Sequence, residues 1–155
     1  MSEDTEQKNK QSVRRENRVA AMQFLYMWDC NRDADSAELL TNFLSGNEEP
    51  REYYAFAETL IAGALLNIDA IDLAIEQSAK NWKISRIAKV DLAILRLAIF
   101  ELLFRDDIPP IVSINEAIDI AKLYSGAESK RFVNGILDKV KSTLTRPLRT
   151  PNQNK

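Results

Sequence analysis

The sequence predicts an all-α protein, and three observations support that prediction. Only four of the 155 residues are glycine and five are proline, which favours long regular elements over a turn-rich β fold. Apolar residues recur at i, i+3, i+4 and i+7 in most segments, the spacing of one helix face. No segment shows the alternation of a half-buried strand. We expect about six or seven helices, packed as one bundle or two small bundles.

The N-terminal part is expected to contain a tail followed by a long helix. Residues 1–12 are polar and predict a disordered tail, which leaves residues 13–145 as a single domain and residues 146–155 as a basic C-terminal tail. The first helix is predicted from Val13 to Cys30, with a buried stripe formed by Ala21, Phe24, Leu25 and Trp28. The lone Cys30 is expected in the core, because a free cysteine usually behaves as a small buried hydrophobe.

The middle of the chain predicts three further helical segments. A short helix covers about residues 36–44, with Asp35 or Ser36 as its N-cap, and a long helical pattern covers residues 51–79. Gly63 and Asn67 are the points where that long pattern is expected to kink or divide. The segment 86–104 is apolar nearly all round, so it predicts a central, buried helix.

Two helices are expected near the C-terminus. Ser113 and Glu116 have the spacing of a capping box that opens the first of them, and Gly126 is expected to close it. The last helix has a predicted core face of Val133, Ile136, Leu137 and Val140.

Composition argues against catalysis and against a bound metal. The chain has no histidine, which removes the commonest general base and the commonest metal ligand, and a single cysteine allows no internal disulfide. No glycine-rich phosphate loop is present. We therefore expect no catalytic residue, no metal site and no cofactor. No apolar run approaches about 20 residues, and the polar N-terminus does not have the pattern of a secretory signal, so a cytoplasmic protein is expected.

The net charge of −2 conceals an uneven distribution. Residues 8–18 have a net charge of +4, residues 139–155 of +5, and the intervening residues 19–138 of −8. Basic ends on an acidic body are typical of a polyanion contact, and equally of two solvated tails. Arg14, Arg15 and Arg18 favour the first interpretation. They are predicted to lie at the start of a helix, where its dipole disfavours cations, and a bound polyanion would relieve the repulsion.

Two other sets of residues are not explained by helix packing. Asp91 is surrounded on its own helix by Ile87, Ala88, Ile94 and Leu95, so its carboxylate needs a partner from elsewhere: another helix of this chain, or a second protein. Lys130, Arg131 and Phe132 open the last helix. An aromatic ring beside two cations is suited to single-stranded RNA, although Phe132 is equally compatible with the core.

Several segments together resemble the NusB family of bacterial transcription antitermination factors. The resemblance covers about residues 13–141, and its most specific part is "INEAI" followed by "FVNGILD"; the other matching segments are "RRENRVAAMQFLYMW", "VDLAILRLAIFELLF" and "KRFVNGILDKV". It implies an all-α fold of about seven helices in two small packed bundles, without enzymatic activity. It also implies binding of the single-stranded boxA element of ribosomal RNA leaders, together with the ribosomal small-subunit protein NusE. Other Nus factors and RNA polymerase are then indirect partners.

The resemblance also assigns roles to particular residues. Arg14, Arg15 and Arg18 fall in the family's arginine-rich motif, which contacts RNA, and Glu16 departs from that motif where a basic residue is common. Residues matching the loop and helix start that line the RNA site are Glu128, Lys130, Arg131 and Phe132. Tyr26 and Asp91 match the surface that contacts NusE. "SINEAIDIAKLY" is expected to be scaffold.

Two alternatives share the predicted fold. The first is an RNA-binding module like the N-terminal domain of ribosomal RNA cytosine methyltransferases, whose catalytic domain needs glycine-rich cofactor loops that this chain lacks. The second is a helical homodimer in which the RNA surface is masked.

Overall fold

The computed structural model describes residues 2–80 and 83–152, and within those residues it contains helices but no β-strand. This confirms the all-α prediction. The α-helices and two short 3-10 helices, in chain order, are α1 (Glu3–Asp29), α2 (Ser36–Ser45), η1 (Arg51–Tyr54), α3 (Ala55–Leu66), α4 (Ile68–Ser78), η2 (Ile84–Arg86), α5 (Lys89–Phe104), α6 (Pro110–Tyr124) and α7 (Ala127–Ser142).

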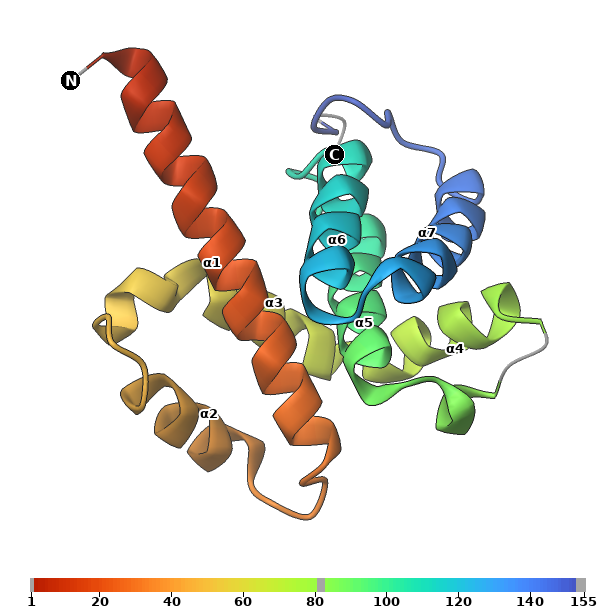
Figure 1. The fold of residues 1–155 in the computed structure, drawn as a ribbon, viewed down its shortest axis with the longest axis horizontal. Coiled ribbons are helices and arrows are strands. Elements are labelled where there is room, and N and C mark those ends of the chain that lie inside the picture. The colour runs from red at the N-terminus through yellow and green to blue at the C-terminus, as the bar shows by residue number, and fades with distance from the viewer. Residues whose placement is uncertain (1, 81–82, 153–155) are drawn as a thin grey trace.

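Helix α5 is the centre of the fold. It packs against α1 and α3 on one side and against α4, α6 and α7 on the other, so two small bundles share it (Figure 1). Every residue from Asp91 to Leu102 is buried, as the all-round apolar pattern predicts. The predicted stripe of α1 and the predicted core face of α7 are also buried.

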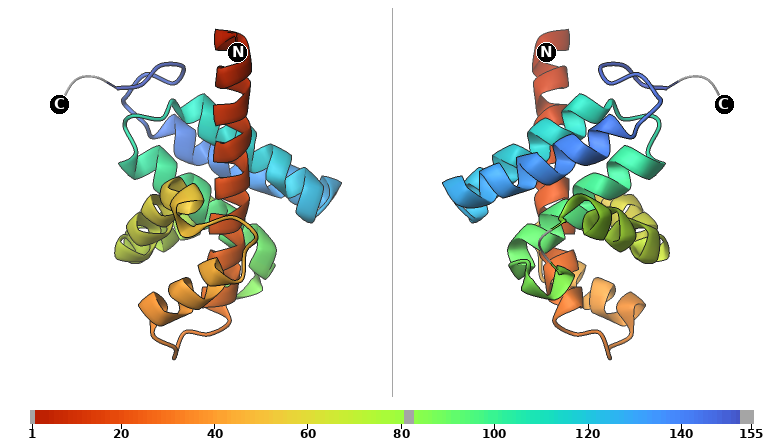
Figure 2. Two further views of the ribbon diagram at one scale, coloured as in Figure 1. Left: turned by 90° about the vertical axis from the view of Figure 1, so that its left-hand side faces the viewer. Right: turned by 90° about the vertical axis from the view of Figure 1, so that its right-hand side faces the viewer.

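Helix α1 begins at Glu3, ten residues before the predicted start at Val13. The Ser2 side chain caps it by accepting a hydrogen bond from the backbone N–H of Thr5 at 3.3 Å, and Glu3, Asp4 and Glu6 suit the positive end of the dipole. Residues 3–12, expected to be a disordered tail, thus continue the helix. They extend beyond the rest of the molecule, as Figures 1 and 2 show.

The long helical pattern of residues 51–79 divides at Asn67, one of the two predicted points. The Asn67 side-chain amide donates to the Gly63 carbonyl oxygen at 2.8 Å and thereby caps the end of α3. Gly63 itself contacts α5: a Cβ atom at this position would overlap the Phe100 ring. The absence of a side chain at Gly63 therefore allows α3 to approach α5 closely.

Two predicted helix starts differ from the structure. Helix α5 begins at Lys89 rather than Arg86, because Ile87 and Ala88 have extended backbone after the 3-10 turn η2. Helix α6 begins with Pro110 in its first turn, so the predicted capping box at Ser113 is wrong. Ser113 lies inside the helix and donates to the Glu101 carboxylate at 2.8 Å.

The segment after α7 folds back over the end of α5. The Ile111 N–H donates to the Leu148 carbonyl oxygen at 3.0 Å, and the Arg146 guanidinium donates to the carbonyl oxygens of Glu101, Leu102 and Ile108. Arg146 therefore gives a partner to the Leu102 carbonyl, one of the last four of α5, and a second donor to the Glu101 carbonyl, which also accepts from the Arg105 N–H.

Two smaller results complete the fold. Cys30 is exposed at the C-cap of α1, so its predicted place in the core is wrong. None of the described helices has the length and apolar character that a membrane crossing requires.

Candidate nucleic-acid interface

The three arginines of α1 have three different environments. Arg18 is only 3% exposed, and its guanidinium forms a two-point contact with Glu101 of α5: Nε lies 3.0 Å from Oε2 and Nη2 lies 2.8 Å from Oε1. A phosphate could reach this group only if the buried pair opened. The structure thus gives Arg18 a packing role in joining α1 to α5, and its burial argues against the predicted RNA contact.

Arg14 is exposed and lies over an aromatic ring. Its guanidinium carbon is 4.5 Å from the centre of the Phe56 ring, within the range of a cation–π interaction. A guanidinium stacked in this way still presents N–H groups at its edge, and phosphate oxygens accept from such an edge in a bidentate manner.

Arg15 bridges α1 and α6. Its Nε donates to Glu116 Oε2 at 2.8 Å and its Nη2 donates to Asp119 Oδ2 at 2.7 Å. The hydrogen bond to Glu116 raises the pKa of Arg15, although burial opposes the shift, so the cation is held firmly. Glu116 is therefore an ion-pair partner and not the capping residue predicted from the sequence.

Glu16 does not lie unpaired between the arginines. The Tyr53 hydroxyl donates to its carboxylate, and this hydrogen bond raises the pKa of Tyr53 to about 12. Residue 16, where the family motif is often basic, thus links α1 to η1.

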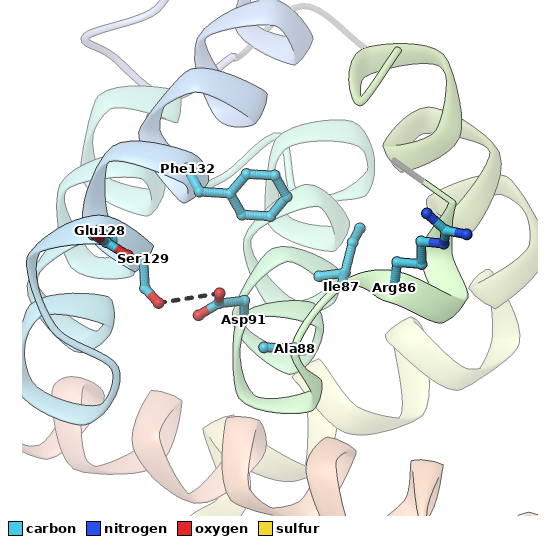
Figure 3. Close-up of a pocket in the computed structure, with 7 residues that line it drawn as sticks. All are labelled: Arg86, Ile87, Ala88, Asp91, Glu128, Ser129 and Phe132. Carbon is cyan, nitrogen blue, oxygen red and sulfur yellow. Dashed lines mark hydrogen bonds between the residues drawn. The ribbon is translucent and has the colours of Figure 1, made fainter. Parts of the chain in front are cut away.

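Asp91 lies in a pocket of about 280 Å³ between the start of α5 and the start of α7 (Figure 3). Its Oδ2 accepts a hydrogen bond from the Ser129 hydroxyl at 3.1 Å, while its Oδ1 is buried without a hydrogen-bond partner. Arg86 also lines the pocket, but its guanidinium points away from Asp91. Among the described contacts Asp91 therefore has its partner on another helix of this chain, α7, and that partner is a neutral hydroxyl.

The same pocket brings together residues from two predicted sites. Glu128 and Phe132, predicted for RNA, line it together with Asp91, predicted for a protein partner. The Phe132 ring points into the pocket and is half-buried, whereas Lys130 and Arg131 are exposed on the first turn of α7. The arginines of α1 and Tyr26, which is 41% exposed, do not line this pocket.

A second hollow lies between α1 and the end of α6, and little in the sequence indicates it. This groove of about 270 Å³ is lined by Arg15, Glu16, Val19, Ala20, Gln23, Asn47, Tyr54 and Tyr124. Tyr124 is 48% exposed. The sign of it in the sequence is Tyr124, an aromatic residue near the end of the helix that Gly126 is expected to close. In the part of the chain that the structure describes, no group of three or more acidic or cysteine side chains could hold a metal ion.

Comparison with known proteins identifies the family. Residues 15–142, most of the chain, match the sequence profile of the NusB family. The chain belongs to the NusB family. A NusB from Geotalea daltonii, named transcription antitermination protein, is 46% identical over 144 residues, which cover 86% of this chain and 97% of that protein. A NusB from Bacillus cereus, with the same name, is 44% identical and covers 84% of this chain and 98% of its own length.

Solved NusB structures have the same fold. The Thermotoga maritima NusB structure is 38% identical with a TM-score of 0.75, over 84% of this chain and 91% of that one. A crystal structure of the antitermination factors NusB and NusE with double-stranded RNA has a TM-score of 0.76 and 28% identity, over 86% of this chain and 98% of that one. NusB proteins are antitermination factors and not enzymes, so this chain is non-enzymatic.

Proposed function

We propose that this chain is a transcription antitermination factor that binds the single-stranded boxA element of ribosomal RNA leader transcripts together with NusE. The observation that carries the proposal is its similarity, over 86% of its length, to the NusB chain of a solved complex with NusE and RNA. The bound pair would then join other Nus factors on RNA polymerase in the cytoplasm.

The RNA contacts are proposed to come from two exposed basic groups. Arg14 and Arg15 supply cations on α1, and Lys130 and Arg131 supply them on the first turn of α7. Such residues bind the phosphate backbone with an affinity that falls as salt rises. Glu128 and Phe132, beside the α7 cations, are proposed to contact the bases. Arg18 contributes indirectly, because its pairing with Glu101 fixes α1 against α5.

The NusE contact is proposed to involve Tyr26 and Asp91. The buried Oδ1 of Asp91 has no hydrogen-bond partner, and a buried acceptor in that state is costly. A donor from a bound protein would satisfy it if the pocket opened on binding, because the oxygen is buried in the free chain. Tyr26 offers an exposed ring on α1, of the residue type that interfaces favour.

Fluorescence anisotropy tests this function directly. A labelled boxA RNA and a scrambled RNA of equal length are titrated with the protein, with and without purified NusE, at two salt concentrations. The proposal requires that boxA binds better than the scrambled RNA and that NusE tightens boxA binding. Equal binding of both RNAs, with no effect of NusE, would reduce the chain to a general RNA-binding helical module.

A variant separates the two partners. Asp91→Asn keeps the shape of the side chain but removes its charge, so we expect it to weaken NusE binding more than RNA binding by the chain alone. Equal losses in both assays would count against a NusE role for Asp91.

A further inference from the structure

The groove between α1 and the end of α6 contains a mixture of groups that differs from a phosphate site. Its charged side chains are one cation, Arg15, and one anion, Glu16, so their formal charges cancel. Arg15 is also held by two carboxylates on the α6 side, Glu116 and Asp119. A phosphodiester gains little from the groove itself, where Glu16 offsets Arg15, so the phosphate contacts of Arg14 and Arg15 are expected outside the groove. A neutral group with hydrogen-bonding edges suits its interior.

The remaining polar residues of the groove are two amides, Gln23 and Asn47, and two tyrosines, the buried Tyr54 and the exposed Tyr124. Gln23 on α1 and Asn47 after α2 each present a donor and an acceptor, which is what a base edge requires. Tyr124, 48% exposed at the end of α6, presents a ring of the kind on which unpaired bases stack. The groove volume of about 270 Å³ is near the lower limit of small-molecule pockets, about 300 Å³.

The position of the groove connects the two basic groups. Arg15, one of the two basic residues of α1, lines the groove. Tyr124 is the last residue of α6 and directly precedes the turn that leads into α7, the helix that carries Lys130 and Arg131. A strand of RNA whose backbone contacts both groups would therefore pass the groove. Phe132, the aromatic residue predicted for stacking, is half-buried in the other pocket.

We propose that this groove is a base-binding subsite, in which one unpaired nucleobase of the bound RNA stacks on Tyr124 while the amides of Gln23 and Asn47 contact its edge. This rests on the proposed RNA-binding function and adds a subsite to it.

Substitutions at Tyr124 test the stacking contact. Tyr124→Ala and Tyr124→Leu should weaken boxA binding about fivefold or more, and Tyr124→Phe should retain it, because stacking needs the ring and not the hydroxyl. The slope of affinity against salt should not change, since no cation is lost. Leu123→Ala is the matched control: Leu123 is the adjacent residue and is 71% exposed, yet it does not line the groove.

RNA with a single abasic site then identifies the base. The site is moved along boxA, and each RNA is titrated with the wild-type protein and with Tyr124→Ala. At one position the two proteins should bind equally, because the base that Tyr124 holds is already missing. A Tyr124→Ala protein that binds intact boxA as well as wild type, or a deficit that persists at every abasic position, would overturn the subsite.

The outcome for the subsite is separable from the outcome for the function. If wild-type protein prefers boxA and responds to NusE while all Tyr124 variants bind normally, the subsite is wrong and the proposed function stands. If wild-type protein shows no preference for boxA and no response to NusE, both are wrong.

Discussion

Arg18 of α1 and Glu101 of α5 form a buried ion pair, with Nη2 of the arginine 2.8 Å from Oε1 of the glutamate. The Ser113 hydroxyl of α6 donates to the same oxygen, so one carboxylate joins three helices from both bundles. Each partner is almost fully buried, with side chains 4% and 1% exposed. Loss of either charge would leave the other buried without compensation.

Replacement of Arg18 should therefore destabilise the fold. Arg18→Met removes the charge but keeps much of the length, and we expect the free energy of unfolding to fall by about 3 kcal/mol or more, the usual cost of breaking a buried pair. Urea denaturation followed by circular dichroism measures it. The control is Arg14→Met on the exposed face of α1, expected to change stability by about 0.5 kcal/mol or less. Similar small losses in both variants would contradict a packing role for Arg18.

The contact between Gly63 and Phe100 predicts the effect of adding one methyl group. Gly63→Ala should lower the melting temperature, because the new Cβ would meet the Phe100 ring and overpacking costs about 1–3 kcal/mol. Gly135→Ala is the matched control, since no heavy atom outside its own helix lies within 4 Å and alanine favours a helix by about 1 kcal/mol. We expect the melting temperature to fall in Gly63→Ala and to rise in Gly135→Ala. An equal rise in both variants would mean that α3 and α5 are less closely packed.

The pairing of Arg15 with α6 predicts a variant that binds RNA more tightly. Asp119→Asn removes one of the two carboxylates that hold Arg15, so the guanidinium becomes more available to phosphate. Both groups are partly exposed, so we expect a gain of about two- to fivefold at low salt, equivalent to about 0.5–1 kcal/mol. The control, Asp138→Asn, makes the same change in charge at an exposed pair with Lys141 on α7. Equal gains in RNA affinity for the two variants would reflect net charge alone. A loss of RNA affinity in Asp119→Asn would show that Asp119 does not compete with phosphate for Arg15.

The interactions of the Asp29 carboxylate predict that the stability of the fold depends on pH in the acidic range. Burial alone would raise the pKa of this carboxyl, but hydrogen bonds from Lys89 and Arg32, together with the ion pair to Arg96, outweigh it and lower the pKa. A lowered pKa gives stability that is present above the unfolded value of about 3.9 and is lost as pH falls through the folded value. As pH falls below about 4, the free energy of unfolding of Asp29→Asn should therefore decrease less than that of wild type.

Urea midpoints measured from about pH 6 down to about pH 2.5 would show this difference. The exposed Asp33→Asn provides a control with the same substitution. Parallel curves for wild type and Asp29→Asn would show that the cluster around Asp29 does not stabilise its ionised form.

Helical periodicity correctly predicted which residues of α1, α5 and α7 are buried, because each of those faces packs against a neighbouring helix. It also held an unused signal about Arg18, which lies three residues before Ala21 and seven before Leu25, on the predicted core face. The sequence could not supply its partner, since Glu101 is 83 residues away and only the packing of α1 on α5 brings them together.

Local motifs were less reliable where tertiary contacts compete with them. Ser113 and Glu116 have the spacing of a capping box, but both side chains bind other helices, and two prolines start α6 earlier. The predicted RNA residues do not form one site. Arg14 and Arg15 lie at the surface of α1 and Arg18 is buried, while Lys130 and Arg131 are exposed at the start of α7 and only Glu128 and Phe132 line the Asp91 pocket. Tyr124 of the groove was not among the predicted residues. Such a groove depends on how α1 and α6 lie together, which no single helix pattern encodes.

The most direct test of the central claim, that the exposed arginines of α1 bind RNA, is the salt dependence of boxA binding by Arg14→Ala/Arg15→Ala. Loss of two phosphate contacts should weaken binding and reduce the slope of log affinity against log salt by about 1.4, with little change in melting temperature. A control pair, Arg32→Ala/Arg51→Ala, removes two other exposed arginines and should retain the slope. An unchanged slope and affinity in the Arg14/Arg15 variant, with the fold intact, would contradict the claim.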